Sequence, residues 1–248
     1  MADVSRADIC AIACADLFRD NGEILASPMS TMSMVGARLA RLSFAPDLLI
    51  SDGEALLLAE TPPIGGTSPI EGWIPYRKVF DVVAAGTRHV VMGANQLDRF
   101  GNQNISHFGS YERPARMMFG PRGGPGNSIN HSTSYWVGKH SNRVFVETVD
   151  FVAGVGADRA RVGPAGRFHG LFRTVTNLGV FDYPGSTDGA MNIVSLHPGV
   201  SFDDVQAATG FELDRPAQIA TTRGPTDVEV ELLQRIDPRN FRGKEVSE

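Results

Sequence analysis

The sequence is organised around the stretch Gly93-Ala94-Asn95-Gln96-Leu97-Asp98-Arg99-Phe100-Gly101-Asn102-Gln103-Asn104. This stretch follows His89-Val90-Val91-Met92, a short apolar run rich in β-branched residues that is typical of a buried strand. Most of the stretch is Gly, Asn, Gln or Asp, residue types that permit close backbone approach and offer hydrogen-bond donors and acceptors. It therefore predicts a loop at a strand end that binds a polar ligand at the edge of an α/β sheet, or else an ordinary polar turn.

The N-terminal part of the chain alternates between helix and strand patterns. Ser5-Arg6-Ala7-Asp8 has the pattern of a capping box, and the apolar residues after it recur at helical spacing until Asn21-Gly22. Residues 24–26 and 47–50 are typical of strands, and residues 31–42 between them are typical of a helix. This alternation predicts an α/β fold with a central, largely parallel sheet flanked by helices. Because no repeat or dividing linker is found, we expect one domain over residues 1–248.

The rest of the chain continues this alternation after an irregular segment. Residues 61–76 hold four prolines and three glycines, so we expect a long loop that serves in binding or in an interface, followed by a helix over residues 78–85. Strands are expected at residues 144–149, 172–176, 179–182 and 193–196. A second capping box at Ser201-Phe202-Asp203-Asp204 predicts a helix that ends at Gly210, and a peripheral helix is expected over residues 226–236.

The amino-acid composition limits the classes of protein to which this chain can belong. With 42% apolar and 21% charged residues, the chain has the composition of an ordinary globular protein. Its formal net charge of -5 and its lack of a Lys/Arg cluster argue against a nucleic-acid partner or an anionic membrane surface. No run approaches the ~18 apolar residues of a membrane span, so we expect a cytoplasmic protein. The two cysteines, Cys10 and Cys14, lie four apart in an apparent helix, which indicates packing rather than a metal or redox site.

Two further segments carry candidate reactive groups. Ser51-Asp52-Gly53-Glu54 places two carboxylates after a predicted strand; alternatively, Asp52-Gly53 only makes a turn and Glu54 begins a helix. Glycines at positions 123, 124 and 126 let several backbone N–H groups converge on one anionic oxygen, as in an oxyanion hole or a phosphate nest. His131 is either a titrating group near that site or a neutral, hydrogen-bonded histidine.

Four motifs resemble one protein family in the same order. The central stretch is similar to G-A-x-Q-V-D-x-x-G-N-x-N, a signature of the β subunits of family I CoA-transferases, with Leu97 in place of Val. Similarities to that family continue at Phe119-Gly120-Pro121-Arg122-Gly123-Gly124-Pro125-Gly126-Asn127, at Thr176-Asn177-Leu178-Gly179-Val180-Phe181-Asp182, and at His197-Pro198-Gly199-Val200 with Thr209-Gly210-Phe211. The resemblance covers roughly residues 5–212 and implies a CoA-transferase-like α/β domain.

The resemblance also implies where the site lies. The family's transferases carry a nucleophilic Glu in an S-E-N-G-like turn, and this chain has Ser51-Asp52-Gly53-Glu54 there, so the Glu is either shortened to Asp52 or displaced to Glu54. These two carboxylates and His131 are the catalytic candidates, and no metal site is implied. The candidates for binding substrate or CoA, or for stabilising an oxyanion, are Gly93, Asn95, Gln96, Asn102, Asn104, Gly123, Gly124 and Asn127.

Within the family, the chain looks most similar to the actinobacterial hydrolases that open the last carbon rings of cholesterol and related steroids. Asn95 in the signature, the departure at residues 51–54 and the segment 131–137 suggest this branch. The resemblance then implies hydrolytic C–C cleavage of a cyclic β-keto CoA thioester by a heterodimer with an α subunit, assembled to α2β2, without a cofactor besides the substrate's CoA. The alternatives are a CoA-transferase β subunit that uses Asp52 or Glu54 as nucleophile, and a noncatalytic structural β subunit.

Overall fold

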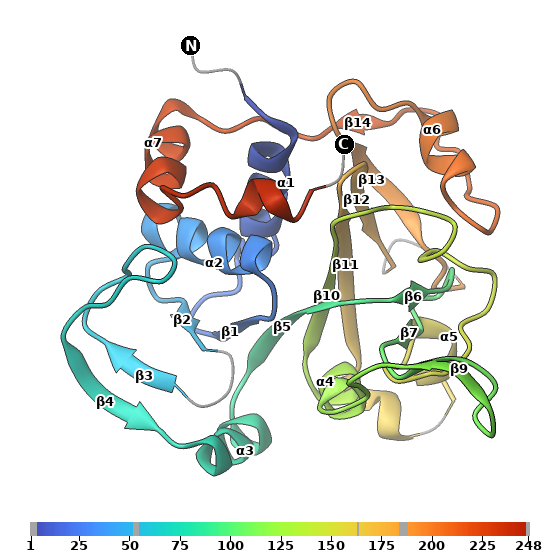
Figure 1. The fold of residues 1–248 in the computed structure, drawn as a ribbon, viewed down its shortest axis with the longest axis horizontal. Helices are drawn as coiled ribbons and strands as arrows, with labels where there is room; N and C mark the ends of the chain where they lie inside the picture. The colour runs from blue at the N-terminus through green and yellow to red at the C-terminus, as the bar shows by residue number, and fades with distance from the viewer. Residues whose placement is uncertain (1–3, 52–54, 163, 184–187, 247–248) are drawn as a thin grey trace. The chain divides into compact units, whose positions relative to one another are not determined.

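The computed structural model describes residues 4–51, 55–162, 164–183 and 188–246. The chain divides into two compact units: unit 1 is Met1–Val91 with Arg223–Glu248, and unit 2 is Met92–Thr222. Each unit combines helices with strands, as expected of an α/β protein (Figure 1). The single domain expected over residues 1–248 stays a prediction.

Unit 1 contains a parallel arrangement of three strands. β1 (Leu25–Pro28) lies between β2 (Leu49–Ile50) and β5 (Arg88–Gly93), and both pairings are parallel. Parallel neighbours need a crossover connection, and α2 (Thr31–Ser43) supplies the one between β1 and β2. The three strands confirm those predicted at residues 24–26, 47–50 and 89–92.

Helices pack together in unit 1, where α1 (Arg6–Asp16) contacts α2, and α2 contacts α7 (Asp227–Ile236). The predicted capping box of α1 is present, because Ser5 Oγ accepts the N–H of Asp8 and the Asp8 carboxylate accepts the N–H of Ser5. Thr226 caps α7 in the same way, which confirms the helix expected there. The short 3-10 helix η2 (Arg242–Lys244) follows.

The contact between α1 and α2 depends on small residues. Gly36 on α2 has no side chain, and a Cβ at that position would lie 2.7 Å from the Cβ of Cys14. Cys10 and Cys14 are both fully buried on α1. Burial raises the pKa of the Cys10 thiol to about 12, so this thiol stays protonated and unreactive. The packing role predicted for the two cysteines is confirmed.

The segment between β2 and β5 differs from the prediction. β3 (Ala55–Leu58) and β4 (Ile70–Ile74) pair antiparallel, and α3 (Tyr76–Ala85) follows them. Residues 55–58 therefore form a strand, not the start of a helix, and β4 occupies part of the loop that was expected at residues 61–76. The apolar run at residues 55–58 has no period-2 alternation, so it carries no pattern that separates strand from helix.

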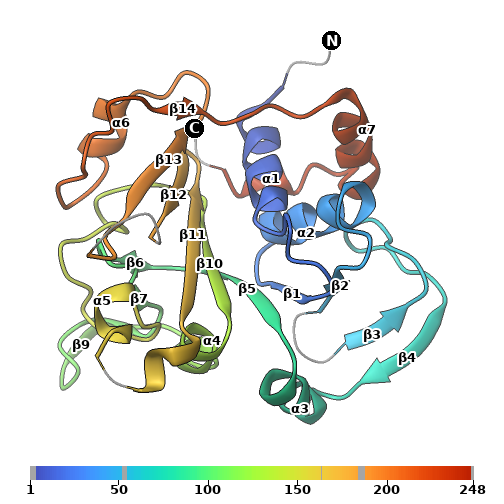
Figure 2. The same ribbon diagram turned by 180° about the vertical axis from the view of Figure 1, so that it is seen from behind.

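Unit 2 contains five neighbouring strands (Figure 2). In spatial order they are β10 (Ser132–Val137), β11 (Gly170–Thr176), β12 (Gly179–Asp182), β13 (Asn192–Leu196) and β14 (Ala220–Thr221). The β10/β11 and β13/β14 pairs are parallel, and the β11/β12 and β12/β13 pairs are antiparallel. The strands predicted at residues 172–176, 179–182 and 193–196 are confirmed.

Two strand assignments in unit 2 were missed or wrong. β10 was not predicted, because its Ser and Thr residues hid the strand pattern. Residues 144–149, predicted as a strand, form none. Phe145 makes only an isolated bridge to Leu97 of β6. Val144 O accepts the N–H of Leu97, and Phe145 O accepts the N–H of Gly210 in the loop after α6. The described part of unit 2 has the helices α4 (Gly124–Asn130), α5 (Ala157–Ala160) and α6 (Phe202–Ala207) and the 3-10 helix η1 (Pro164–Phe168).

Within the described ranges, every helix is too short or too polar to cross a membrane. The same residues contain no group of three or more His, Cys, Asp or Glu side chains that could hold a metal ion.

Candidate functional site

The central stretch folds into a small hairpin that follows the end of β5. Its strands, β6 (Gln96–Leu97) and β7 (Gln103–Asn104), pair antiparallel. The Asp98 carboxylate closes the turn between them, because its Oδ1 accepts the N–H groups of Phe100 and Asn102, each at 3.0 Å. The predicted loop at a strand end is therefore present, and it is rigidly hydrogen-bonded.

Gln96 and Asn104 face each other across this hairpin and are both buried. Asn104 Nδ2 donates to Gln96 Oε1 and to the carbonyl of His107, both at 2.7 Å, and Asn104 Oδ1 accepts the N–H of Ser106 at 2.9 Å. Gln96 Nε2 donates to the Asp150 carboxylate at 3.2 Å. The two amides therefore hold the hairpin to the following segment, and contact between them and a ligand stays a prediction.

Asn102 joins the hairpin to a second loop. Its Nδ2 donates to Asp98 Oδ2 at 2.9 Å and to Asp158 Oδ1 at 3.0 Å, and its Oδ1 accepts the N–H of Gly156 at 2.8 Å. Burial raises the pKa of Asp98, and the nearby Asp158 carboxylate adds to the rise, although the hydrogen bonds from Asn102 and Phe100 oppose it. Asn102 thus separates two carboxylates as part of the loop's framework.

The glycine-rich segment lies directly against the central hairpin. Gly120 N–H donates to the carbonyl of Ile105 at 2.9 Å, and a Cβ on Gly120 would collide with that peptide group. A Cβ on Gly124 would lie 3.3 Å from Ile105 Cδ1 and 3.5 Å from Gln103 Oε1. Gly124 N–H already donates to Pro121 O at 2.9 Å. Gly124 therefore contributes its small size, and its amide is engaged within the segment.

Asn127 and His131 connect the glycine-rich segment to the end of β5. Asn127 is buried, and its Nδ2 lies 3.6 Å from the Sδ of Met92 and 3.5 Å from where a Cβ on Gly123 would be. His131 caps the C-terminus of α4 by donating its N–H to Asn127 O at 3.1 Å, and its imidazole is buried. These residues meet in unit 2 as the sequence motifs implied, and their chemical roles stay predictions.

The remaining candidates fall into two groups. Gly93 and Asn95 are exposed, and a Cβ on Gly93 would meet no atom within 4 Å, so an open space adjoins the end of β5. Asp52 and Glu54 lie outside the described residues. Ser51, immediately before them, donates its N–H to Ala26 O at 2.9 Å in unit 1.

Gln103 was not among the predicted site residues, yet it joins three segments. Its Nε2 donates to Gly93 O at 2.5 Å, and its backbone exchanges hydrogen bonds with Ala153 and Gly154. Its fully buried Oε1 has no hydrogen-bond partner among the described residues and faces Gly124 and Gly154. The only sequence signal was its place inside the central stretch, where it occupies a variable position of the motif.

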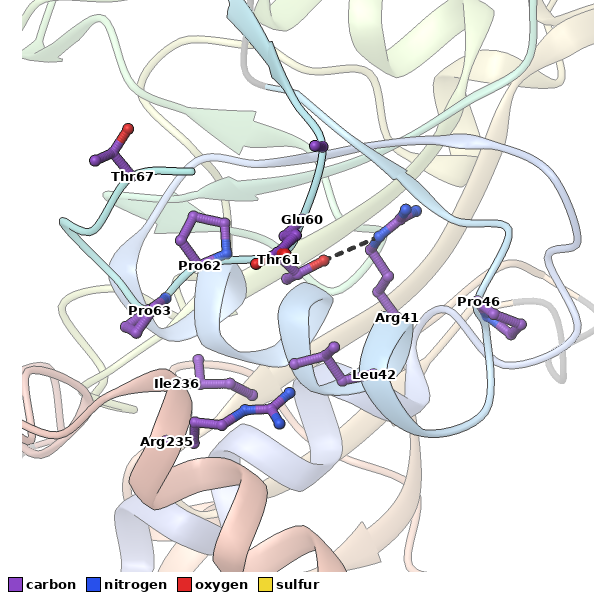
Figure 3. Close-up of a pocket in the computed structure, with 11 residues that line it drawn as sticks. Arg41, Leu42, Pro46, Glu60, Thr61, Pro62, Pro63, Thr67, Arg235 and Ile236 are labelled. Carbon is purple, nitrogen blue, oxygen red and sulfur yellow. Dashed lines mark hydrogen bonds between the residues drawn. The ribbon is translucent and has the colours of Figure 1, made fainter. Parts of the chain in front are cut away.

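A separate pocket of about 650 Å³ lies in unit 1 (Figure 3). Its wall comes from α2, from the loop at residues 59–67 and from the end of α7, and it carries the guanidinium groups of Arg41 and Arg235. Arg41 Nε donates to Thr61 Oγ1 at 3.0 Å, which fixes the loop to α2. None of the residues predicted for the site lines this pocket.

Comparison with known proteins gives a consistent result. The chain is 59% identical over 249 residues to the cholesterol ring-cleaving hydrolase IpdB subunit of Rhodococcus jostii RHA1. The aligned region covers 100% of this chain and 98% of that protein. It is 29% identical over 224 residues to a 3-oxoadipate CoA-transferase subunit of Pseudomonas knackmussii, with 82% of each chain covered. No protein-family model matches the chain.

Solved structures agree with the sequence comparison. The crystal structure of Rhodococcus jostii RHA1 IpdAB matches with a TM-score of 0.95 and 59% identity, and both chains are covered completely. Glutaconate CoA-transferase from Acidaminococcus fermentans matches with a TM-score of 0.79 at 22% identity, covering 96% of this chain and 98% of that one. These likenesses confirm the predicted α/β fold with a large, mostly parallel sheet flanked by helices.

Proposed function

Because the chain belongs to the family of cholesterol ring-cleaving hydrolase IpdB subunits, we propose that it is the β subunit of a heteromeric hydrolase that opens a ring of a cyclic β-keto CoA thioester. The observation that carries the proposal is 59% identity along the whole chain, together with a TM-score of 0.95. The resemblance drawn from the sequence motifs to this branch of the CoA-transferase family is confirmed.

The reaction places specific demands on a site. Water adds to the ring ketone, and the bond between that carbon and the α-carbon of the thioester breaks. The electron pair passes to the α-carbon as a thioester enolate, which then takes up a proton, and the former ketone becomes a carboxylate. Hydrogen-bond donors aimed at the oxyanions that develop supply a large share of the rate in such sites.

Some residues of this chain hold the central loop in place, and one exposed residue is available to contact the substrate. Gln96, Asn102 and Asn104 keep the central loop rigid, because their amides are engaged within it. Asn95 is exposed beside the open space at Gly93, and its carboxamide is the group we assign to a substrate oxygen. Rigid support of this kind is what holds a donor within reach of a developing charge.

The remaining donors and the acid/base groups complete the proposal. Asn127 and Gly123 lie together at the end of β5, and we assign them to the enolate side of the substrate. His131 and the carboxylates of Asp52 and Glu54 are the candidates in this chain for moving protons or holding water. An α subunit supplies the other acid/base groups in this proposal.

The proposed assembly pairs this chain with an α subunit and doubles the pair to α2β2. The homologous IpdAB structure supports a partner of the α type. The substrate's CoA is the only cofactor in the proposal, and the expected location is the cytoplasm. The proposal includes neither a nucleic-acid partner nor a membrane.

A CoA-transferase is the runner-up, and the likeness to the 3-oxoadipate CoA-transferase subunit is the observation that favours it. A transferase must carry CoA as a thioester on its own carboxylate, which here would be Asp52 or Glu54. The identity of 59% to the hydrolase subunit against 29% to the transferase subunit favours hydrolysis. A borohydride-sensitive CoA adduct on either carboxylate of the working complex would establish the transferase instead.

The experiment that tests the proposal is co-expression with an α subunit, followed by mass analysis of the products from a cyclic β-keto CoA thioester. We expect a ring-opened product that has gained one water and keeps its CoA. Each subunit alone should give no product. A complex that forms and binds the thioester but leaves it intact would contradict the proposal.

A further inference from the structure

The proline- and glycine-rich loop at residues 59–69, which connects β3 to β4, is fixed to two helices of unit 1. Ile64 N–H donates to Ile236 O at the end of α7 at 2.8 Å, and Thr61 Oγ1 accepts a hydrogen bond from Arg41 Nε of α2 at 3.0 Å. Because the loop is held on both sides, the pocket of about 650 Å³ that it borders is preformed. A cavity of this volume has the size of a small-molecule site.

Two guanidinium groups on the pocket wall are available to an anion. Arg235 lies in the last turn of α7 and is exposed, and no described carboxylate forms an ion pair with it. Arg41 is half-buried, and its Nε and Nη1 donate to Thr61 Oγ1 and Leu48 O, which leaves Nη2 for a ligand. Among the described residues that line the pocket, the exposed Glu60 is the one acidic residue. The lining therefore has an excess of one positive charge on a chain whose formal net charge is -5.

Much of the remaining lining is apolar. Leu42 of α2 and Ile236 of α7 contribute aliphatic side chains (Figure 3). Three proline rings, which carry no hydrogen-bond donor, complete this surface: Pro46, Pro62 and Pro63. The pocket thus combines cationic groups with an apolar wall, the usual composition of a site that binds an organic molecule and fixes its orientation by a few polar contacts.

The pocket lies at the end of β2 opposite to the candidate carboxylates. The last turn of α2 and Pro46 line the pocket and precede β2, whereas Ser51 follows β2. Ligands of open α/β sheets usually bind outside the carboxyl ends of the strands, and the pocket is at the other edge. Its ligand must therefore be identified from the chemistry of the pocket itself.

We propose that this pocket binds an organic carboxylate with a compact apolar body. A guanidinium group presents paired N–H donors that match the two oxygens of a carboxylate, and Arg235 has such a pair free of any described ion pair. The apolar body packs on Leu42 and the proline rings, and Arg41 Nη2 donates to a further ligand oxygen. One negative charge matches the excess of one positive charge in the lining, whereas a dianion meets repulsion from Glu60. This site goes beyond the proposed function and does not depend on it.

Calorimetric titration of the co-expressed complex with adamantane-1-carboxylate tests the site without turnover. This probe joins one carboxylate to a compact hydrocarbon, and 1-adamantanemethanol has the same body without the charge. We expect one bound carboxylate per copy of this chain, with a Kd at least ~10-fold below that of the alcohol, because the alcohol leaves the guanidinium group unpaired. Acetate should bind at least ~10-fold more weakly than the probe, because it buries far less hydrocarbon.

Substitutions of Arg235 locate the bound probe. Arg235→Gln should weaken binding of adamantane-1-carboxylate at least ~10-fold, and Arg235→Lys should restore part of the affinity because it keeps the charge and loses the paired donors. Arg77→Gln is the matched control, since Arg77 is an exposed arginine of α3 in unit 1 that does not line the pocket. The control should leave the Kd of the probe unchanged.

Four results would overturn the assignment. The wild-type complex could fail to bind the probe, or could bind the alcohol equally well. Inorganic phosphate that displaces the probe at equal concentration would show a site for small oxyanions instead. Unaltered binding in Arg235→Gln would place the probe elsewhere on the complex. Failure of Arg235→Gln to copurify with the α subunit would assign the pocket to the subunit interface.

Discussion

Asn102→Ala removes the side chain that separates two carboxylates in the central loop. The side chain is 1% exposed and makes three hydrogen bonds, of which two go to Asp98 and Asp158 and one comes from Gly156 N–H. A bond to a charged group contributes about 1.5–3 kcal/mol and a neutral one about 1 kcal/mol. Because such terms are not additive and water enters the space, we expect a loss of about 3–5 kcal/mol of unfolding free energy.

Asn102→Asp sharpens this test because it keeps the shape and changes the charge. The new carboxylate would lie about 3 Å from two others, so its pKa in the folded state is raised above the unfolded value of about 3.9. A folded state with a raised carboxyl pKa binds more protons than the unfolded state. Its stability therefore improves as pH falls, and Asn102→Asp should lose less stability at pH 5.5 than at pH 8.

Thermal unfolding of the co-expressed complex at these two pH values is the assay. Asn130→Ala is the matched control, since Asn130 is exposed and donates only to Gly126 O at 3.0 Å in what the structure describes. Asn102→Ala should lower Tm by about 10 °C, and the control by about 2 °C or less. A Tm for Asn102→Ala within about 2 °C of wild type, or a pH-independent effect of Asn102→Asp, would refute the assigned framework role.

Three other outcomes follow from the structure. Gly124→Val should lower turnover of the complex far more than its Tm, because the added methyl groups press on Ile105 and on Gln103, whose amide holds the Gly93 carbonyl beside the proposed substrate-binding loop. Burial opposes ionisation of Asp16 and Glu229, but hydrogen bonds from Arg223 outweigh it and lower the pKa of both carboxyl groups. The stability that these lowered pKa values give is present above about pH 4 and is lost as pH falls further. In urea unfolding, Arg223→Met should therefore destabilise the complex more at pH 7 than at pH 3. The purified chain without an α subunit should turn over no acyl-CoA, and homogeneous, active β subunit would contradict the assembly.

Much of the architecture was predictable because its signals are local. Ser5 with Asp8, and Thr226 in front of α7, carry the chemistry of helix caps within four residues. The β-branched run that forms β5 is typical of a buried strand, whatever strands pair with it. The strands β3 and β10 were missed because the apolar run at residues 55–58 and the Ser/Thr-rich run at residues 132–137 become strands only through partners far along the chain.

The motifs of the candidate site come together as the sequence implied, and the chemical roles of their residues stay predictions. Asn127 lies beside Met92 at the end of β5 and beside Gly123, so the central stretch and the glycine-rich segment meet in unit 2 as their motifs implied. The sequence shows that a residue is Asn or Gln but not whether its amide binds a ligand or another part of the protein. For Gln96, Asn102 and Asn104, the described hydrogen-bond partners belong to the protein. Gln103 was overlooked because its role depends on packing against Gly124 and Gly154.

The most direct test of ring-opening hydrolysis follows the oxygen of water. The co-expressed complex would convert a cyclic β-keto CoA thioester in ¹⁸O-labelled water, with mass analysis of the product before any exchange. The proposed reaction places one ¹⁸O in the new carboxylate and leaves the C–S bond of the CoA thioester intact. Label found instead in an acid released together with free CoA, or CoA moved to an added carboxylic acid, would contradict C–C hydrolysis.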